Sequence, residues 1–158
     1  QFNLTFNREK IMTTIAYKHK DGIVAFDSRL VAGGIIVTDE RYKAKSNGEC
    51  LFVFSGDVSD FEEFVKDYPN IDPNYHYQVQ GALLKNGEVY HVSNDEGIFS
   101  EMLIDFDFAW GSGAEYAYTA MDCGLGAIEA VEKAKLRDIH TGGDVNHVLV
   151  VRDKELPL

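Results

Sequence analysis

Short apolar, β-branched segments alternate with turn-forming residues along most of the chain, a pattern typical of β-strands. Three pairs of these segments flank a short turn and are therefore predicted to form β-hairpins. The pairs run from residues 13–19 to 22–26, from 33–45 to 50–56, and from 78–85 to 88–93. The third pair has the clearest turn, because Asn86 and Gly87 both tolerate the positive φ angles that a two-residue loop requires.

Helical spacing of apolar residues occurs in three segments. From Val58 to Val65 the apolar residues fall on one face, and acidic residues at the start suit the helix dipole. This segment predicts a short helix that ends near Pro69. Residues 114–122 and 127–139 are rich in alanine and other helix formers, and glycines separate them. They predict two consecutive helices.

The carboxyl-terminal segment 145–153 contains the apolar run 148–151, which is typical of a strand covered on both faces. The order of strands, helix, strands, two helices and strand predicts an α+β fold. Specifically, we expect a four-layer αββα sandwich with a reduced helical layer. The regular pattern begins after Met12, so residues 1–12 are expected to be an N-terminal extension, a propeptide or a tag, and residues 13–158 a single domain.

Charge and hydropathy exclude two classes of partner. The 158 residues carry 15 Lys and Arg against 26 Asp and Glu, a net charge of −11, so nucleic acid would be repelled. No apolar run approaches the roughly 20 residues of a membrane span. Residues 1–12 also lack the order of a secretory signal. We therefore expect a soluble, cytoplasmic protein with no membrane partner.

Cysteine and histidine spacing gives no sign of a metal site. Cys50 and Cys123 form no C-x-x-C pair, and no histidines occur at H-x-x-x-H spacing. We expect both cysteines to be buried free thiols and the protein to need no metal or other cofactor.

Four segments combine turn residues with groups that can carry chemistry. They are Thr13-Thr14-Ile15, Asp21 to Arg29, Gly111-Ser112-Gly113 and Arg137 to Gly143. Together they resemble the proteasome β-subunits and their HslV-type relatives, which are N-terminal-nucleophile (Ntn) hydrolases. The resemblance spans nearly the whole chain after Met12. It implies a threonine-type peptidase on an αββα Ntn-hydrolase sandwich, in a compact bacterial or phage-like branch.

The resemblance assigns the nucleophile to Thr13. In the family a threonine becomes the N-terminus, and its hydroxyl attacks an amide carbonyl while its own α-amine, with a pKa of about 7.7–8.0, accepts the proton. Asp27 and Lys43, sixteen residues apart, match the family's aspartate and lysine. The ammonium lowers the cost of forming the alkoxide, and the carboxylate holds the lysine in place. Lys45 competes for the role of the lysine.

The remaining site residues follow from the same resemblance. Gly56 aligns with the glycine whose backbone N–H faces the developing oxyanion. Phe54 would border the pocket for the substrate side chain before the scissile bond. Ser112, Asp138 and Thr141, the last in place of the family's usual serine, would orient the terminal amine through hydrogen bonds.

Three features depart from the family pattern. The interval from Thr13 to Asp27 is two residues short, which implies a shortened first hairpin. Between Gly56 and the Asn-Gly turn there is room for one short helix where the family has two long ones. Finally, residues 1–12 convert the Thr13 amine into an amide, so the enzyme is expected to be inactive until they are absent. We expect translation to start at Met12 and the methionine to be removed.

The primary hypothesis is a peptidase that acts on peptides or unfolded proteins as a homo-oligomeric ring. The chain has no G-x-x-x-x-G-K-[ST] motif, so any ATPase unfoldase would be a separate chain. Two alternatives stay open: a non-catalytic assembly subunit that never frees Thr13, and an amidase for a small molecule. The joint presence of Asp27, Lys43, Ser112 and Asp138 argues against the first, because a ring subunit does not require that set.

Overall fold

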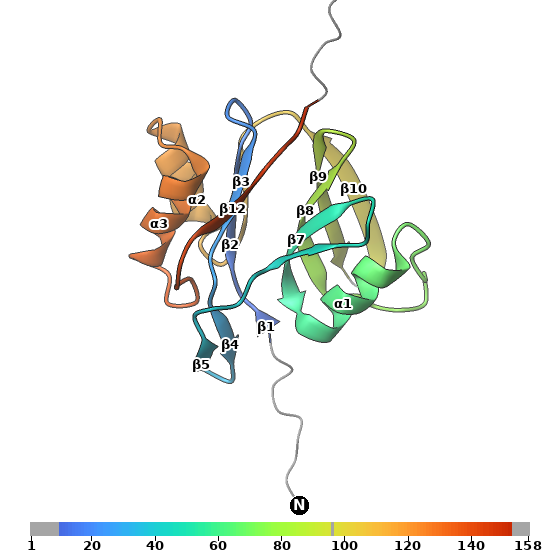
Figure 1. Ribbon diagram of the computed structural model, residues 1–158. Helices are drawn as coiled ribbons and strands as arrows, with labels where there is room; N and C mark the ends of the chain where they lie inside the picture. The colour runs from blue at the N-terminus through green and yellow to red at the C-terminus, as the bar shows by residue number, and fades with distance from the viewer. Residues whose placement is uncertain (1–9, 96, 153–158) are drawn as a thin grey trace, which may run out of the picture.

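The computed structural model describes residues 10–95 and 97–152, and within them two antiparallel β-sheets lie face to face between helices (Figure 1). One sheet has eight strands: β1 (Lys10–Ile11), β4 (Leu30–Ala32), β5 (Ile35–Thr38), β6 (Ala44–Ser46), β7 (Leu51–Asp57), β8 (Val79–Lys85), β9 (Glu88–Asp95) and β10 (Ile98–Ile104). The other has four: β2 (Thr14–Lys18), β3 (Ile23–Phe26), β11 (Phe108–Gly111) and β12 (Asn146–Leu149).

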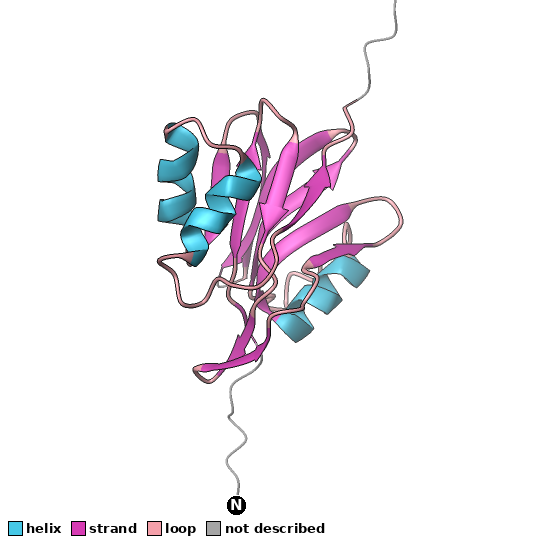
Figure 2. Cartoon of the chain, turned by 60° about the vertical axis from the view of Figure 1, so that its left-hand side comes forward, coloured by secondary structure: helices cyan, strands magenta, loops and turns pink. Residues whose placement is uncertain are grey.

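The three helices of the described residues cover the outer faces of the two sheets. They are α1 (Val58–Asp67), α2 (Ala114–Asp122) and α3 (Ala127–Lys135). Figures 1 and 2 show α2 and α3 together on the four-stranded sheet and α1 on the eight-stranded sheet. This arrangement is the predicted α+β plan of four layers, with one short helix forming the reduced layer.

Strand alternation explains how the layers are held together. In β2, Ile15 and Tyr17 point into the apolar core between the sheets, while Ala16 points to the opposite face. On that face Ala16 and Ala25 contact α2 and α3, whose own packing residues are also largely alanine. Small side chains on both surfaces allow the helices to approach the sheet closely.

Most of the predicted elements are present where the pattern placed them. The first and third hairpins form as β2–β3 and β8–β9. Asn86 and Gly87 have φ angles of 54° and 73°, as the two-residue turn requires. The α1 helix begins after Asp57, whose carboxylate accepts a hydrogen bond from the Asp60 N–H, and ends before Pro69.

Two predictions about strands are wrong. Residues 33–45 do not form one strand: β5 pairs with β4, whereas β6 pairs with β7. The predicted coverage of the last strand on both faces is also wrong, because β12 is an edge strand and Leu149 is 62% exposed. The apolar run in this segment reflects a preference for β-strand structure and does not indicate burial. Of the cysteines, Cys50 is buried as expected, but Cys123 is exposed.

The segment before Thr13 reaches into the fold. Lys10 and Ile11 form β1, which pairs antiparallel with both β7 and β4. The predicted extension of residues 1–12 therefore joins the eight-stranded sheet at its carboxyl end, while residues 1–9 lie outside the described part of the chain. Among the described residues, no helix combines the length and the hydropathy needed to span a membrane.

Candidate active site

Thr13, Asp27 and Lys43 form one buried cluster. Thr13 immediately precedes β2 and Asp27 immediately follows β3, and pairing of these two strands brings the residues together. The Thr13 hydroxyl donates a hydrogen bond to Asp27 Oδ1, and Lys43 Nζ donates to the same oxygen at 2.8 Å. All three residues are fully buried. The structure thus joins residues that are far apart in the sequence around a single carboxylate oxygen.

Asp27 and Lys43 form an ion pair that is fully buried. The second oxygen of Asp27 accepts backbone hydrogen bonds from Gly142 at 2.9 Å and from Arg29 at 3.3 Å. Burial lowers the pKa of Lys43, because the charged ammonium loses its hydration, and the neighbouring Asp27 carboxylate opposes that shift. Removing either partner would leave an unpaired charge in the core.

Lys45, the competing lysine, lies elsewhere. Its Nζ forms an ion pair with Glu62 at 2.9 Å, on the side of the eight-stranded sheet that α1 covers. Lys43 and Lys45 are two residues apart across the start of β6 but differ sharply in environment, since Lys43 has no exposed side-chain surface and Lys45 is 29% exposed. Among these two lysines, only Lys43 contacts Asp27.

Ser112, Asp138 and Thr141 form a second cluster that adjoins the first. Asp138 Oδ2 accepts hydrogen bonds from the Ser112 hydroxyl at 2.5 Å and from the Thr141 hydroxyl at 2.6 Å. Thr141 in turn lies 2.8 Å from the hydroxyl of Thr14. Because the single Thr141 proton is directed to Asp138, Thr14 must be the donor to Thr141. The network therefore contacts the residue after Thr13 directly.

The backbone of Thr13 links the two clusters. The Ser112 N–H donates to the Thr13 carbonyl at 2.9 Å. Burial raises the pKa of Asp138, but the hydrogen bonds from Ser112 and Thr141 outweigh that effect and hold its pKa below the ordinary value. An ionised carboxylate is therefore fixed close to the Thr13 main chain.

Two glycines allow main-chain segments to approach the site. A side chain at Gly111 would place its Cβ 1.8 Å from the Thr13 carbonyl oxygen, and φ there is +92°. At Gly56, φ is +130° and a Cβ would lie 2.0 Å from the Gln78 carbonyl oxygen. Other residues would be strained at either position. Phe54, two residues before Gly56, is fully buried in the apolar cluster beneath α1.

The chain before Thr13 fills a slot between two strands. Ile11 is the register partner of Gly56 on β7, and Lys10 is the partner of both Asp57 on β7 and Val31 on β4. An extended segment in this slot completes the backbone ladder between β4 and β7. Thr13 lies two residues after Ile11, at the end of this slot.

Sequence reasoning did not identify two residues of this arrangement. Thr14 takes part in the Asp138 network, and the only signal for it was its place beside Thr13. Gly142 supplies a backbone donor to Asp27, and a Cβ there would lie 2.3 Å from the Arg29 guanidinium. Within the described residues, no group of three or more His, Cys, Asp or Glu side chains is arranged to hold a metal ion.

Comparison with known proteins identifies the fold but finds no close sequence relative. No family model matches the chain, and no curated protein matches it. Eukaryotic HslV from Trypanosoma brucei superposes with a TM-score of 0.63 at 16% identity, over 85% of this chain and 97% of HslV.

A second structural neighbour is BPH from Thiobacillus denitrificans. In complex with epoxomicin it superposes with a TM-score of 0.63 at 15% identity, over 89% of this chain and 99% of BPH. Another structure of BPH gives 0.61 at 16% identity, over 90% and 100% of the two chains. At such identities the likeness establishes the fold. The chain therefore has the fold of HslV and BPH, which is the fold that its sequence motifs predicted.

Proposed function

We infer that the protein is a threonine-type peptidase whose nucleophile is the Thr13 hydroxyl, active once residues 1–12 are absent. The observation that carries this proposal is the buried cluster of Thr13, Asp27 and Lys43 at the end of the slot between β4 and β7. Burial of a hydroxyl, a carboxylate and an ammonium together costs free energy, so packing of the core does not explain their presence there. At the end of a peptide-shaped slot they fit covalent catalysis.

The free α-amine of Thr13 acts as the general base in the proposed mechanism. It takes the proton from the Thr13 hydroxyl as Oγ attacks the substrate carbonyl, and the Lys43 ammonium stabilises the developing alkoxide. The backbone N–H of Gly56 is the expected donor to the oxyanion. Asp27 holds Lys43 in position, and Ser112, Asp138 and Thr141 orient the amine.

The tetrahedral intermediate collapses with cleavage of the C–N bond, and the α-ammonium returns its proton to the leaving nitrogen. An ester on Thr13 Oγ remains. A water molecule then gives a proton to the α-amine and attacks the ester, which releases a carboxylic acid and restores the hydroxyl. No cofactor is required for either step.

The slot between β4 and β7 supports a peptide as the substrate. An extended peptide can add its backbone hydrogen bonds to both strands, as Lys10 and Ile11 do in the unprocessed chain. A small amide could not complete this ladder. The slot therefore favours peptide hydrolysis over the amidase alternative.

The experiment that tests the function uses a chain that begins at Thr13, released from a cleavable fusion. We expect it to hydrolyse members of a fluorogenic peptide panel, with kcat/KM reduced at least about a thousandfold in Thr13→Ala. Thr13→Ser keeps a hydroxyl and an amine and should retain measurable activity. Thr119→Ala, at an exposed position on α2, is the matched control and should behave as wild type.

Other outcomes of this experiment separate the alternatives. Hydrolysis of small amides but of no peptide would favour an amidase. A folded chain beginning at Thr13 that hydrolyses neither class would favour the non-catalytic assembly subunit.

We also propose that the protein assembles into a homo-oligomeric ring. Apolar side chains are exposed on the edge strand β10, where Ile98, Phe99, Met102 and Leu103 are between 40% and 73% exposed. The β4–β5 hairpin exposes Ile35 at 68%. Patches of this kind on a soluble protein mark association surfaces, and identical subunits commonly close into rings. An ATPase that delivers unfolded protein would be a separate chain.

Light scattering tests the assembly. We expect a mass several times that of the 17.7 kDa chain, and a smaller mass for Ile98→Lys or Ile35→Lys, because a buried lysine at an interface is costly. A strictly monomeric mass of the wild type at high concentration would rule the ring out.

A further inference from the structure

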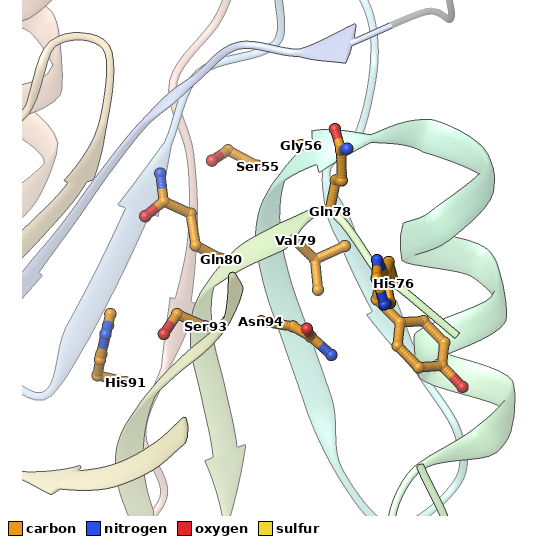
Figure 3. Close-up of a pocket in the computed structure, with 10 residues that line it drawn as sticks. Ser55, Gly56, His76, Gln78, Val79, Gln80, His91, Ser93 and Asn94 are labelled. Carbon is orange, nitrogen blue, oxygen red and sulfur yellow. The ribbon is translucent and has the colours of Figure 1, made fainter. Parts of the chain in front are cut away.

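We propose that a cavity beside Gly56 binds the leaving-group side of the substrate and selects an uncharged polar residue immediately after the scissile bond. This inference rests on the proposed peptidase function and extends it to substrate choice. The cavity has a volume of about 840 Å³ and is lined by residues from β7, β8, β9 and the segment before β8 (Figure 3).

A row of polar residues crosses three neighbouring strands at this cavity. Ser55 on β7 is the register partner of Gln80 on β8, and Gln80 is the partner of Ser93 on β9. One step along the same sheet face, Val53 and Ala82 belong to the apolar core between the sheets. The face thus changes from apolar to polar where it reaches the end of the strands that carries Gly56.

The side-chain hydroxyl and amide groups of this row have no hydrogen-bond partner among the residues that the structure describes. Ser55 is only 4% exposed, and its hydroxyl makes no hydrogen bond to the described residues. The side chains of Gln80, which is exposed, and Ser93, which is half-buried, make no hydrogen bond to the described residues either. Figure 3 shows all three on the same side of β8 as His91, whereas Asn94 and His76 lie on the other side. The hydrogen-bonding capacity of these three side chains is therefore not used within the described part of the chain, and a ligand in the cavity can take it up.

His91 adds a defined donor to the cavity wall. The Trp110 indole N–H donates to His91 Nδ1 at 2.8 Å, which places the ring proton on Nε2. Burial lowers the pKa of His91, so the neutral ring is favoured. His91 can therefore offer an N–H to a ligand without carrying a charge.

The position of the cavity relative to Thr13 points to the leaving-group side. In the unprocessed chain, Ile11 occupies the slot beside Gly56, which is the path for the acyl side of a substrate. On the other side of Thr13, the space where the chain itself continues is occupied by β2. The leaving residues of a second peptide therefore need another route. Ile15 points between the sheets, and strand alternation directs Thr13 toward the same space as Ser55.

The residues that line the cavity explain why we expect an uncharged polar residue after the scissile bond. The ten residues that line the cavity include no Lys, Arg, Asp or Glu. Hydroxyl, amide and imidazole groups match the donors and acceptors of Gln, Asn, Ser or Thr side chains. A carboxylate would meet no compensating cation in a protein of net charge −11. Three strands span about 10 Å, which is the length of about three extended residues.

The test compares internally quenched peptides that differ only in the residue after the cleaved bond, with the chain that begins at Thr13. For wild type we expect kcat/KM to be higher with Gln than with Leu or Glu at that position. Gln80→Leu should lower the Gln-to-Leu ratio about tenfold, and Ser93→Ala should lower it about threefold. Ser100→Ala is the control, because Ser100 is the partner of Ser93 on β10 but is exposed and lies outside the cavity.

Two negative results have different meanings. If the wild type cleaves these peptides and the ratio is unchanged in both folded variants, the cavity does not select the leaving residue, and the peptidase function stands. If the wild type cleaves no peptide at all, the inference falls together with the proposed function. Thermal melting of each variant establishes that it is folded, and Ser93→Ala, with its small change in volume, covers the case in which Gln80→Leu does not fold.

Discussion

Replacing Lys43 by alanine in a chain that begins at Thr13 is expected to abolish peptide hydrolysis almost as completely as Thr13→Ala does. Lys43 Nζ lies 2.8 Å from Asp27 Oδ1, which also accepts the hydrogen bond from the Thr13 hydroxyl. All three residues are fully buried. Without the ammonium, the alkoxide forms beside an uncompensated Asp27 carboxylate. We expect kcat to fall by about a thousandfold or more, measured with the best fluorogenic peptide of the panel.

Three control variants sharpen this result. Lys43→Met keeps most of the side-chain volume and should lose as much activity as Lys43→Ala, which separates charge from packing. The double variant with Thr13→Ala should be no worse than either single one, because the residues act as a unit. Lys45→Ala should keep its activity, since Lys45 pairs with Glu62. Full activity in Lys43→Ala with loss only in Lys45→Ala would assign the role to the other lysine.

The presence of residues 1–12 should switch the enzyme off. A peptide bond to Met12 delocalises the lone pair of the Thr13 nitrogen, so the general base is absent. The slot between β4 and β7 is also filled by Lys10 and Ile11. We expect the intact 158-residue chain to hydrolyse the peptide panel at least about a hundredfold more slowly than the chain that begins at Thr13.

A chain that begins at Met12, released from a fusion in vitro, separates the two causes. It lacks β1 but still has an amide at Thr13, so the loss of the base alone predicts that it is inactive. Activity in this chain would show that occupation of the slot is the main brake. Intact mass must accompany each assay, because trace removal of Met12 would imitate activity. Equal rates for the intact 158-residue chain and the chain that begins at Thr13 would contradict both explanations.

Local signals in the sequence were sufficient for most of the fold. The Asn86-Gly87 turn specifies the β8–β9 hairpin, and the apolar spacing from Val58 to Val65, closed by Pro69, specifies α1. Long-range pairing was not visible locally. Residues 33–45 have strand composition throughout, but β5 and β6 pair with different strands, and the loop between them carries Lys43 to Asp27.

The residues of the candidate site could be predicted only where the sequence resembles the proteasome β-subunits. It named Thr13, Asp27 and Lys43, and the structure brings these three residues together. It could not show that Thr14 contacts the Asp138 network through Thr141, because that contact depends on how the two clusters pack. It also gave no sign of the β1 segment in the slot.

The polar row at the cavity lay beyond sequence reasoning for a related reason. Ser55, Gln80 and Ser93 become neighbours only when the strand registers of β7, β8 and β9 are known. Each of them, taken alone, is an ordinary strand residue on a partly polar face. A shift of one residue in any register would turn its side chain to the α1 face instead.

The most direct test of the proposed mechanism is a covalent label on Thr13. Epoxomicin, with which BPH from Thiobacillus denitrificans forms a complex, is incubated with the chain that begins at Thr13 and with the intact 158-residue chain, and each is analysed by intact mass and peptide mapping. We expect one inhibitor molecule per chain, mapped to Thr13, in the first sample, and none in the second or in Thr13→Ala. The same adduct on an intact, uncleaved 158-residue chain, or an adduct on any other residue, would contradict the mechanism.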